Sequence, residues 1–150
     1  HYYVTVGKFS SILPSSIGAS FMADIYFSSP GAISFLPHLR IDGDYQYLDK
    51  GKDSIQGPSL HIGPLWSFGK KYILHFSPLV GAGYYKITST NSSDETFNRD
   101  KLSLNGKCII GFNFKFYNFV IGPQFRMSYI HDSKAPLYGL GGGLALGYIF

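Results

Sequence analysis

The sequence is poor in cysteine and in charged residues, and each shortage excludes a class of protein. The single cysteine, Cys108, rules out an intrachain disulfide and any metal site made of several cysteines. Charged residues amount to 15%, and the 13 lysines and arginines form no dense block despite a net charge of +4, so no nucleic-acid partner is expected. No run of about 18 apolar residues offers a transmembrane helix. No signal peptide is recognisable either, which leaves a cytoplasmic protein or a mature exported one.

Aromatic residues make up 17% of the sequence, and they occur in segments where bulky and small or polar residues alternate. Between Leu102 and Phe116, for example, bulky side chains dominate one parity, and polar or small ones dominate the other. A period of two is typical of a β-strand, whose side chains point alternately to opposite faces. The pattern predicts eight strands in a single domain (residues 1–150), at residues 2–9, 18–27, 33–47, 60–68, 72–84, 102–116, 119–129 and 138–150.

The connections between these segments alternate in length. Tight turns are expected at 28–32, 69–71 and 117–118, and longer polar loops at 10–17, 49–57, 89–101 and 131–137. Sequential antiparallel strands with short turns at one end and long loops at the other form an up-and-down barrel. Both chain termini are then expected at the short-turn end.

The bulky face of such a barrel can point inward or outward. It points inward in a soluble, lipocalin-like barrel and outward in an outer-membrane barrel. An eight-stranded interior is only just wide enough to be filled by side chains, so it cannot hold so many large apolar ones. The other face is rich in glycine and serine and fits a narrow interior. The pattern therefore favours an all-β, eight-stranded antiparallel up-and-down transmembrane β-barrel over a soluble barrel.

Aromatic residues on the bulky face gather near both ends of the predicted strands, as in the girdles at the two membrane interfaces. The short-turn girdle comprises Trp66, Phe68, Tyr72, Phe116, Tyr148 and Phe150, and the long-loop girdle comprises Tyr45, Tyr47, Tyr84, Tyr129 and Tyr138. A tilted strand from Tyr138 to Tyr148 rises roughly 25 Å, the height of a lipid-facing band.

The C-terminal segment ends in Leu146, Tyr148 and Phe150 at alternate positions. This pattern resembles the signature of bacterial outer-membrane proteins that the barrel-assembly machinery reads. Length, strand count and loop alternation resemble the group of outer membrane protein A, outer membrane protein X and the opacity proteins, and "FSPLVGAGYY" (76–85) is similar to a strand common there. The resemblance implies an exported protein of a Gram-negative-type outer membrane, with both termini periplasmic, in contact with the bilayer and with lipopolysaccharide or another outer-leaflet lipid.

Four prolines conflict with this fold, because a closed barrel has no edge where a missing N–H is harmless. Pro37, Pro64, Pro78 and Pro123 all fall inside predicted strands on the outward parity. Each is expected to mark a bulge or a local slip of the parity.

The inward parity carries a polar cluster whose members are expected at similar heights: Arg40, Asp42, His61, Lys107 and Arg126, with Asp24 and Asp44 above or below. Charges in a narrow lumen are expected to pair with one another, because an unpaired buried charge is costly. Such pairs would plug the lumen. The alternative is a gated path for water or ions.

Enzymatic activity is the third possibility, and it is not expected. His75 and Ser77 have the spacing of outer-membrane lipid A deacylases but point inward, and no carboxylate at their depth is obvious. His61 and His131 lie toward the loops, where a palmitoyltransferase would have its polar groups. No cofactor is expected, and His1, His38 and His61 do not form a convincing metal site. The expected role is structural or interactive: an anchor, an adhesin or a subunit of an envelope complex, with loops or periplasmic turns contacting any protein partner.

Overall fold

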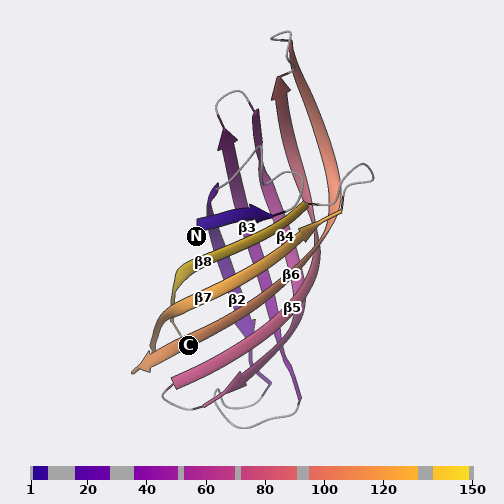
Figure 1. The fold of residues 1–150 in the computed structure, drawn as a ribbon. Helices are drawn as coiled ribbons and strands as arrows, with labels where there is room; N and C mark the ends of the chain where they lie inside the picture. Colours follow the sequence, from indigo (N-terminus) through magenta and orange to yellow (C-terminus); the bar gives the residue numbers. More distant parts are fainter. Residues whose placement is uncertain are drawn as a thin grey trace.

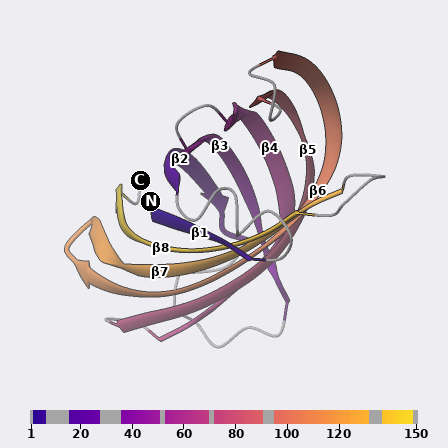
Figure 2. The same cartoon turned by 45° about the horizontal axis from the view of Figure 1, so that its top comes forward.

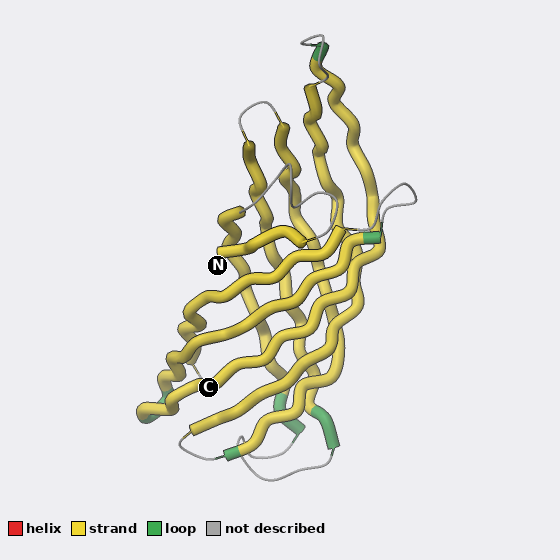
Figure 3. The backbone as a smooth tube through the Cα atoms, viewed as in Figure 1, coloured by secondary structure: helices red, strands yellow, loops and turns green. Residues whose placement is uncertain are grey.

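The chain is built almost entirely of β-strands (Figures 1 and 3). The computed structural model describes residues 2–6, 16–27, 36–50, 53–69, 72–90, 95–131 and 137–148. Its strands are β1 (Tyr2–Val6), β2 (Ser16–Ile25), β3 (His38–Lys50), β4 (Asp53–Phe68), β5 (Tyr72–Thr90), β6 (Thr96–Phe116), β7 (Phe119–Ile130) and β8 (Leu137–Tyr148). Within these ranges, no helix has the length and hydropathy needed to cross a lipid bilayer.

Seven strands, β2 to β8, pair in chain order, each antiparallel to the next, and curl into an open half-barrel (Figures 1 and 2). The short β1 pairs with β8 from Tyr2 to Val6 but reaches β2 only through Tyr2 opposite Ile17 and Tyr3 opposite Ser16. The order of paired strands therefore continues from β8 through β1 to β2. Most of the length between β2 and β8, however, has no strand pairing across it. The predicted eight-stranded barrel is confirmed only as an all-β, antiparallel, up-and-down half-barrel.

The cause lies in the register of β1. Its first described residue, Tyr2, stands opposite Gly142, so β8 continues past it. Tyr2 also stands opposite Ile17, so β2 continues past it on the other side. A strand of five residues is too short to line both of these longer neighbours. We call this side, between β2 and β8, the seam.

Two of the predicted loops are wrong. The segment 49–57 is mostly strand, because β3 runs to Lys50 and β4 begins at Asp53. The segment 89–101 is also mostly strand, since β5 runs to Thr90 and β6 begins at Thr96. The β5–β6 pair is accordingly the longest hairpin and projects beyond the other strands (Figure 1). The two-residue turn 117–118 is as predicted, whereas 28–32 lies outside the described residues.

Pro64, Pro78 and Pro123 cause neither a bulge nor a change of parity. Pro64 and Pro78 face the same interruption of the β4–β5 pairing, and the register is identical on both sides of it. Pro123 faces a similar interruption between β6 and β7. Each of the three prolines stays paired with the strand on its other side. None of them therefore removes a hydrogen bond from that second ladder. Pro37 precedes β3.

The two faces of the sheet have opposite chemistry. The concave inner face buries polar side chains, among them Asp42 and Arg126, which are both 0% exposed. The convex outer face carries most of the large apolar side chains, such as Leu102, which is 73% exposed. A small apolar cluster around Ile55 and Tyr85 covers the interior toward the long-loop end. The inward and outward parities predicted from alternation are therefore confirmed in the described strands.

Candidate functional site

One strand supplies the polar row at the centre of the interior. In β3, every second residue from His38 to Gln46 is polar and buried: His38, Arg40, Asp42, Asp44 and Gln46. The period of two directs all five side chains to the same face. Because charged groups are stable in a dry interior only when they are paired, partners must come from the other strands.

Lys107 of β6 supplies the central partner. Its ammonium group lies 2.5 Å from Asp42 Oδ2 and also contacts Asp44 Oδ2. Arg126 of β7 approaches Asp42 Oδ1 at 3.5 Å. The side chains of Lys107, Asp42, Asp44 and Arg126 are all buried, so these two carboxylates and two cations balance one another away from water. We call this group the central network.

A second pair lies on the short-turn side of the central network. Arg40 Nε is 2.6 Å from Asp24 Oδ1, and Arg40 Nη2 is 2.7 Å from Asp24 Oδ2. This bidentate geometry is the strongest form of arginine–carboxylate contact. The expected pairing of Arg40, Lys107 and Arg126 with aspartates is thus present, and each of the three cations has an aspartate partner.

His61 lies beside the central network and forms no ion pair in the described residues. Donor atoms of Asp42, Asp44 and His61 lie within 4.8 Å of one another, an arrangement that could hold a metal ion and that was not predicted. Lys107, however, already contacts both carboxylates. The chain's own ammonium group therefore occupies the position that a metal cation would take.

Neutral side chains complete the network, and sequence reasoning did not single them out. Ser59 donates a hydrogen bond to Asp44 Oδ1, and Gln46 Nε2 donates one to Asp44 Oδ2 at 3.4 Å. Arg126 Nη2 donates to Gln124 Oε1 at 3.2 Å. Gln46 and Gln124 share the inward parity of the charges, so alternation could have found them. Ser59 lay just before the predicted strand 60–68.

The residues considered for catalysis are engaged elsewhere. Ser77 Oγ donates to the carbonyl of Pro64 at 2.7 Å, while the ring nitrogens of His75 lie 3.4 Å from the side-chain amides of Asn113 and Gln124. His131 is exposed, and its ring nitrogen Nδ1 lies 3.2 Å from the Tyr129 hydroxyl. These contacts do not assemble Ser77 and His75 as a nucleophile and its base.

The predicted girdle residues lie on the outer face wherever they are described. Exposed members are Phe68, Tyr72, Phe116, Tyr148, Tyr45, Tyr47, Tyr84 and Tyr138, while Trp66 and Tyr129 are partly covered. Some contact aromatic rings on neighbouring strands: the ring centroids of Trp66 and Phe76 lie 6.0 Å apart, and those of Tyr129 and Tyr138 lie 5.3 Å apart. Leu146 and Tyr148 of the predicted assembly signal are exposed on β8, and Phe150 lies outside the described residues.

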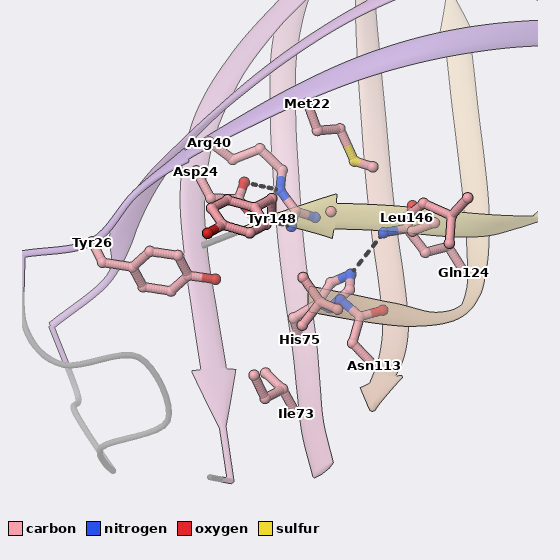
Figure 4. A pocket seen from close by; sticks show the side chains of 13 residues that line it. Met22, Asp24, Tyr26, Arg40, Ile73, His75, Asn113, Gln124, Leu146 and Tyr148 are labelled. Carbon is pink, nitrogen blue, oxygen red and sulfur yellow. Dashed lines mark hydrogen bonds and ion pairs between the residues drawn. The ribbon is translucent and has the colours of Figure 1, made fainter. Parts of the chain in front are cut away.

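A pocket of about 490 Å³ adjoins the Arg40–Asp24 pair on the short-turn side (Figure 4). Figure 4 shows Arg40 and Asp24 on one side and His75, Asn113 and Gln124 on the other. Tyr26, which follows β2, also lines the pocket, and burial raises the pKa of its hydroxyl to about 12. That hydroxyl therefore stays protonated at neutral pH and is available as a hydrogen-bond donor.

The chain matches no protein-family model and no curated protein. The outer face, the central network and the pocket are therefore the features that bear on its function.

Proposed function

We propose that this protein is an integral outer-membrane β-barrel with a structural or interaction role. In the bilayer the half-barrel is completed into a closed eight-stranded transmembrane barrel, and the central network plugs its lumen. The observation that carries this proposal is the reversal of burial: large apolar side chains cover the outside, and charged ones fill the inside. Soluble proteins rarely expose apolar patches of more than a few hundred Å², whereas a lipid-facing surface must be apolar.

The interior supports a plug rather than a channel or an active centre. Among the described residues, Arg40, Lys107 and Arg126 each contact an aspartate, so these paired charges offer no surplus of one sign to select passing ions. Eight strands enclose a space that side chains can fill. We propose no enzymatic activity and no cofactor. A small gated pore and a lipid-modifying enzyme are the functions against which this proposal is tested.

The proposed partners follow from the outer face and from β8. The bilayer, with lipopolysaccharide or another outer-leaflet lipid, would cover the apolar band and its aromatic girdles. The barrel-assembly machinery would read the alternating end of β8, at Leu146 and Tyr148 followed by Phe150. Both termini would then be periplasmic, and the long β5–β6 hairpin would project from the opposite side as the surface for any protein partner.

Arginine substitutions on the outer face can distinguish a membrane-embedded barrel from a water-soluble one. Val80 is 69% exposed in the middle region of β5, and Phe97 is 58% exposed near the tip of β6. We expect Val80→Arg to lower the unfolding free energy in lipid vesicles by about 2–4 kcal/mol, the cost of arginine at the bilayer midplane.

Phe97→Arg is the matched control and should change the unfolding free energy little, because the hairpin tip would lie outside the bilayer. The measurement is urea unfolding followed by the heat-dependent shift in gel mobility. Equal, small effects of both substitutions, or a purified protein that stays monomeric without detergent, would contradict a membrane location.

A further inference from the structure

The projecting part of the β5–β6 hairpin leaves one edge of β6 without a neighbouring strand. There β6 pairs with β5 as far as Thr96, but its pairing with β7 begins only at Asn105. Figure 1 shows this part of β6 extending beyond the end of β7. Among the described residues, no strand pairs with residues 96–102 on the side of β7. We call this stretch the open edge.

The hydrogen bond from His131 N to Leu104 O, 2.9 Å long, fixes which backbone groups of the open edge point away from β5. Because His131 directly follows β7, the carbonyl of Leu104 points to the β7 side. Along a strand, the N–H and C=O of one residue point the same way, and the direction reverses at each step. The residues that share the direction of Leu104 are Thr96, Asn98, Asp100 and Leu102. Their N–H and C=O groups therefore line the open edge as alternating donors and acceptors.

The open edge is regular enough to pair with another strand. Natural sheet edges are often blunted by a proline, by a bulge or by a very short strand. The open edge contains no proline, and its register with β5 continues without a bulge to Thr96. Thr88 Oγ1 also donates a hydrogen bond to Asn98 Oδ1 at 2.9 Å, which joins the two strands near the tip.

Charged side chains determine which strand the open edge can accept. Phe97, Arg99 and Lys101 lie on one face of it, because they share a parity. Asp100 belongs to the other face, and Glu95 precedes the strand. Opposite charges on neighbouring strands stabilise the pair, and like charges destabilise it. A strand that fits this face therefore carries acidic residues opposite Arg99 and Lys101 and an apolar residue opposite Phe97.

We propose that the open edge binds an extended acidic segment of a partner protein, which adds to β6 as a further antiparallel strand. A polypeptide backbone presents N–H and C=O groups at the spacing of the edge, whereas the phosphates of a lipid head group offer acceptors only. Antiparallel pairing is also slightly more stable per residue than parallel pairing. This inference deepens the interaction role proposed above and rests on it, since the hairpin must lie outside the bilayer to contact a partner.

The test uses the full chain folded in a nonionic detergent and a fluorescently labelled peptide, Val-Glu-Thr-Glu-Thr-Val-Thr. Aligned antiparallel to β6, its first valine stands opposite Leu102, and its two glutamates stand opposite Lys101 and Arg99. Fluorescence anisotropy should show saturable binding. The peptide with both glutamates replaced by lysine should bind at least about tenfold more weakly, because its charges repel those of the edge. No saturable binding of the glutamate peptide, or equal binding of the lysine peptide, would overturn the proposal.

Methyl groups on the peptide nitrogens separate strand addition from simple charge attraction. The first two threonines stand opposite Asp100 and Asn98, so their N–H groups face β6, whereas those of the glutamates face away. Methylating both threonine nitrogens should abolish saturable binding, and methylating both glutamate nitrogens should change the affinity little. Equal binding of the two methylated peptides would show that the surface recognises negative charge alone, as on an anionic lipid, and would refute strand addition.

Failure of this inference and failure of the proposed function give different results. If Val80→Arg causes the expected loss in vesicles but no peptide binds, the membrane location stands and the docking edge is refuted. If the peptide binds but Val80→Arg and Phe97→Arg have equal, small effects, the docking edge stands and the membrane location is refuted.

Two substitutions at one position locate the added strand. Asn98→Pro removes an N–H group from the open edge, whereas Asn98→Ala, the matched control, keeps it. Asn98→Pro should weaken binding of the glutamate peptide by about tenfold or more, and Asn98→Ala should bind like the unsubstituted protein. Heat-dependent gel mobility checks that each variant is folded. Equal affinities of the two folded variants would show that the peptide binds elsewhere.

If Asn98→Pro does not fold, Arg99→Glu decides in its place. It should weaken binding of the glutamate peptide and strengthen binding of the lysine peptide, because it reverses one charge of the edge. An unchanged preference between the two peptides would refute the assignment to the open edge.

Discussion

Among the interior residues, Asp42 is the one whose loss should lower the stability of the fold most. It is fully buried, contacts Lys107 at 2.5 Å and faces Arg126 at 3.5 Å. Removing its carboxylate leaves two cations sharing one remaining carboxylate, that of Asp44, in a dry environment. Removing one partner of a buried ion pair lowers the unfolding free energy far more than the intact pair raises it.

We therefore expect Asp42→Ala to lower the unfolding free energy by about 3–5 kcal/mol, or less where water enters the interior. Urea unfolding in detergent, followed by the fluorescence of Trp66, measures this change. Asp100→Ala on the exposed end of β6 serves as the control and should have little effect. Similar small losses in both variants would mean that the central network is well hydrated.

Cys108 tests the outward parity of β6 at a single position. It lies on the same face as the exposed Leu104 and Ile110. In vesicles it should react with a membrane-permeant maleimide and resist a charged one. A cysteine placed at the exposed Thr96, in a Cys108→Ser background, should react with both reagents. Rapid labelling of Cys108 by the charged reagent would refute a lipid-facing position.

Alternation along the chain was enough to predict which residues point inward, but not which of them meet. Lys107 and Asp42 are 65 positions apart, and their strands, β6 and β3, are not neighbours in the sheet. Their contact crosses the interior, so it depends on the curvature of the sheet and on the stagger of its strands. No local pattern reports either quantity.

Among the elements, the β5–β6 hairpin differs most from the prediction. The sequence predicts a loop for its outer part, because residues 95–100 are mostly polar and their polarity does not change from one parity to the other. Alternation marks a strand only where one face is buried. The pairing nevertheless continues to Thr90 opposite Thr96, carried by backbone hydrogen bonds and cross-strand contacts.

Shortening this hairpin should leave the rest of the sheet intact. We expect that replacing residues 88–98 with a two-residue Asn-Gly turn retains the heat-dependent gel shift and changes the unfolding free energy by less than about 1 kcal/mol. Ile87, which packs against the cluster of Ile55 and Tyr85, is kept in this variant. Failure to fold would instead show that the projecting part of the hairpin is needed to form the sheet.

For the whole molecule, the class of fold and its strand order could be predicted, whereas its closure could not. Closure depends on the register between the first and last strands, and β1 offers only the pairs from Tyr2 to Val6. The strand 2–9 was predicted to be longer, and its residues 7–9 lie outside the described ranges. Alternation shows that a strand exists and which way it faces, but not how far it slides along its neighbour.

The plugged interior predicts the electrical behaviour of the assembled protein. In planar bilayers we expect no large steady conductance, because the side chains of Asp42, Lys107 and Arg126 fill the centre of the interior. Asp42→Ala should raise whatever leak exists. A stable, ion-selective conductance in the unsubstituted protein would instead support the pore hypothesis.

The geometry of the seam dictates what kind of strand can seal it. Both β2 and β8 are antiparallel to β1, so they run parallel to each other and cannot be joined by a simple hairpin. A strand that seals it as a continuation of β1 keeps the direction of β1 and ends opposite Gly143 on β8, and under the proposed membrane location its side chains level with Leu144 and Leu146 are apolar. The seam therefore acts as a template that specifies direction, register and polarity together. An ordinary sheet edge, which accepts partners in either direction, is much less selective.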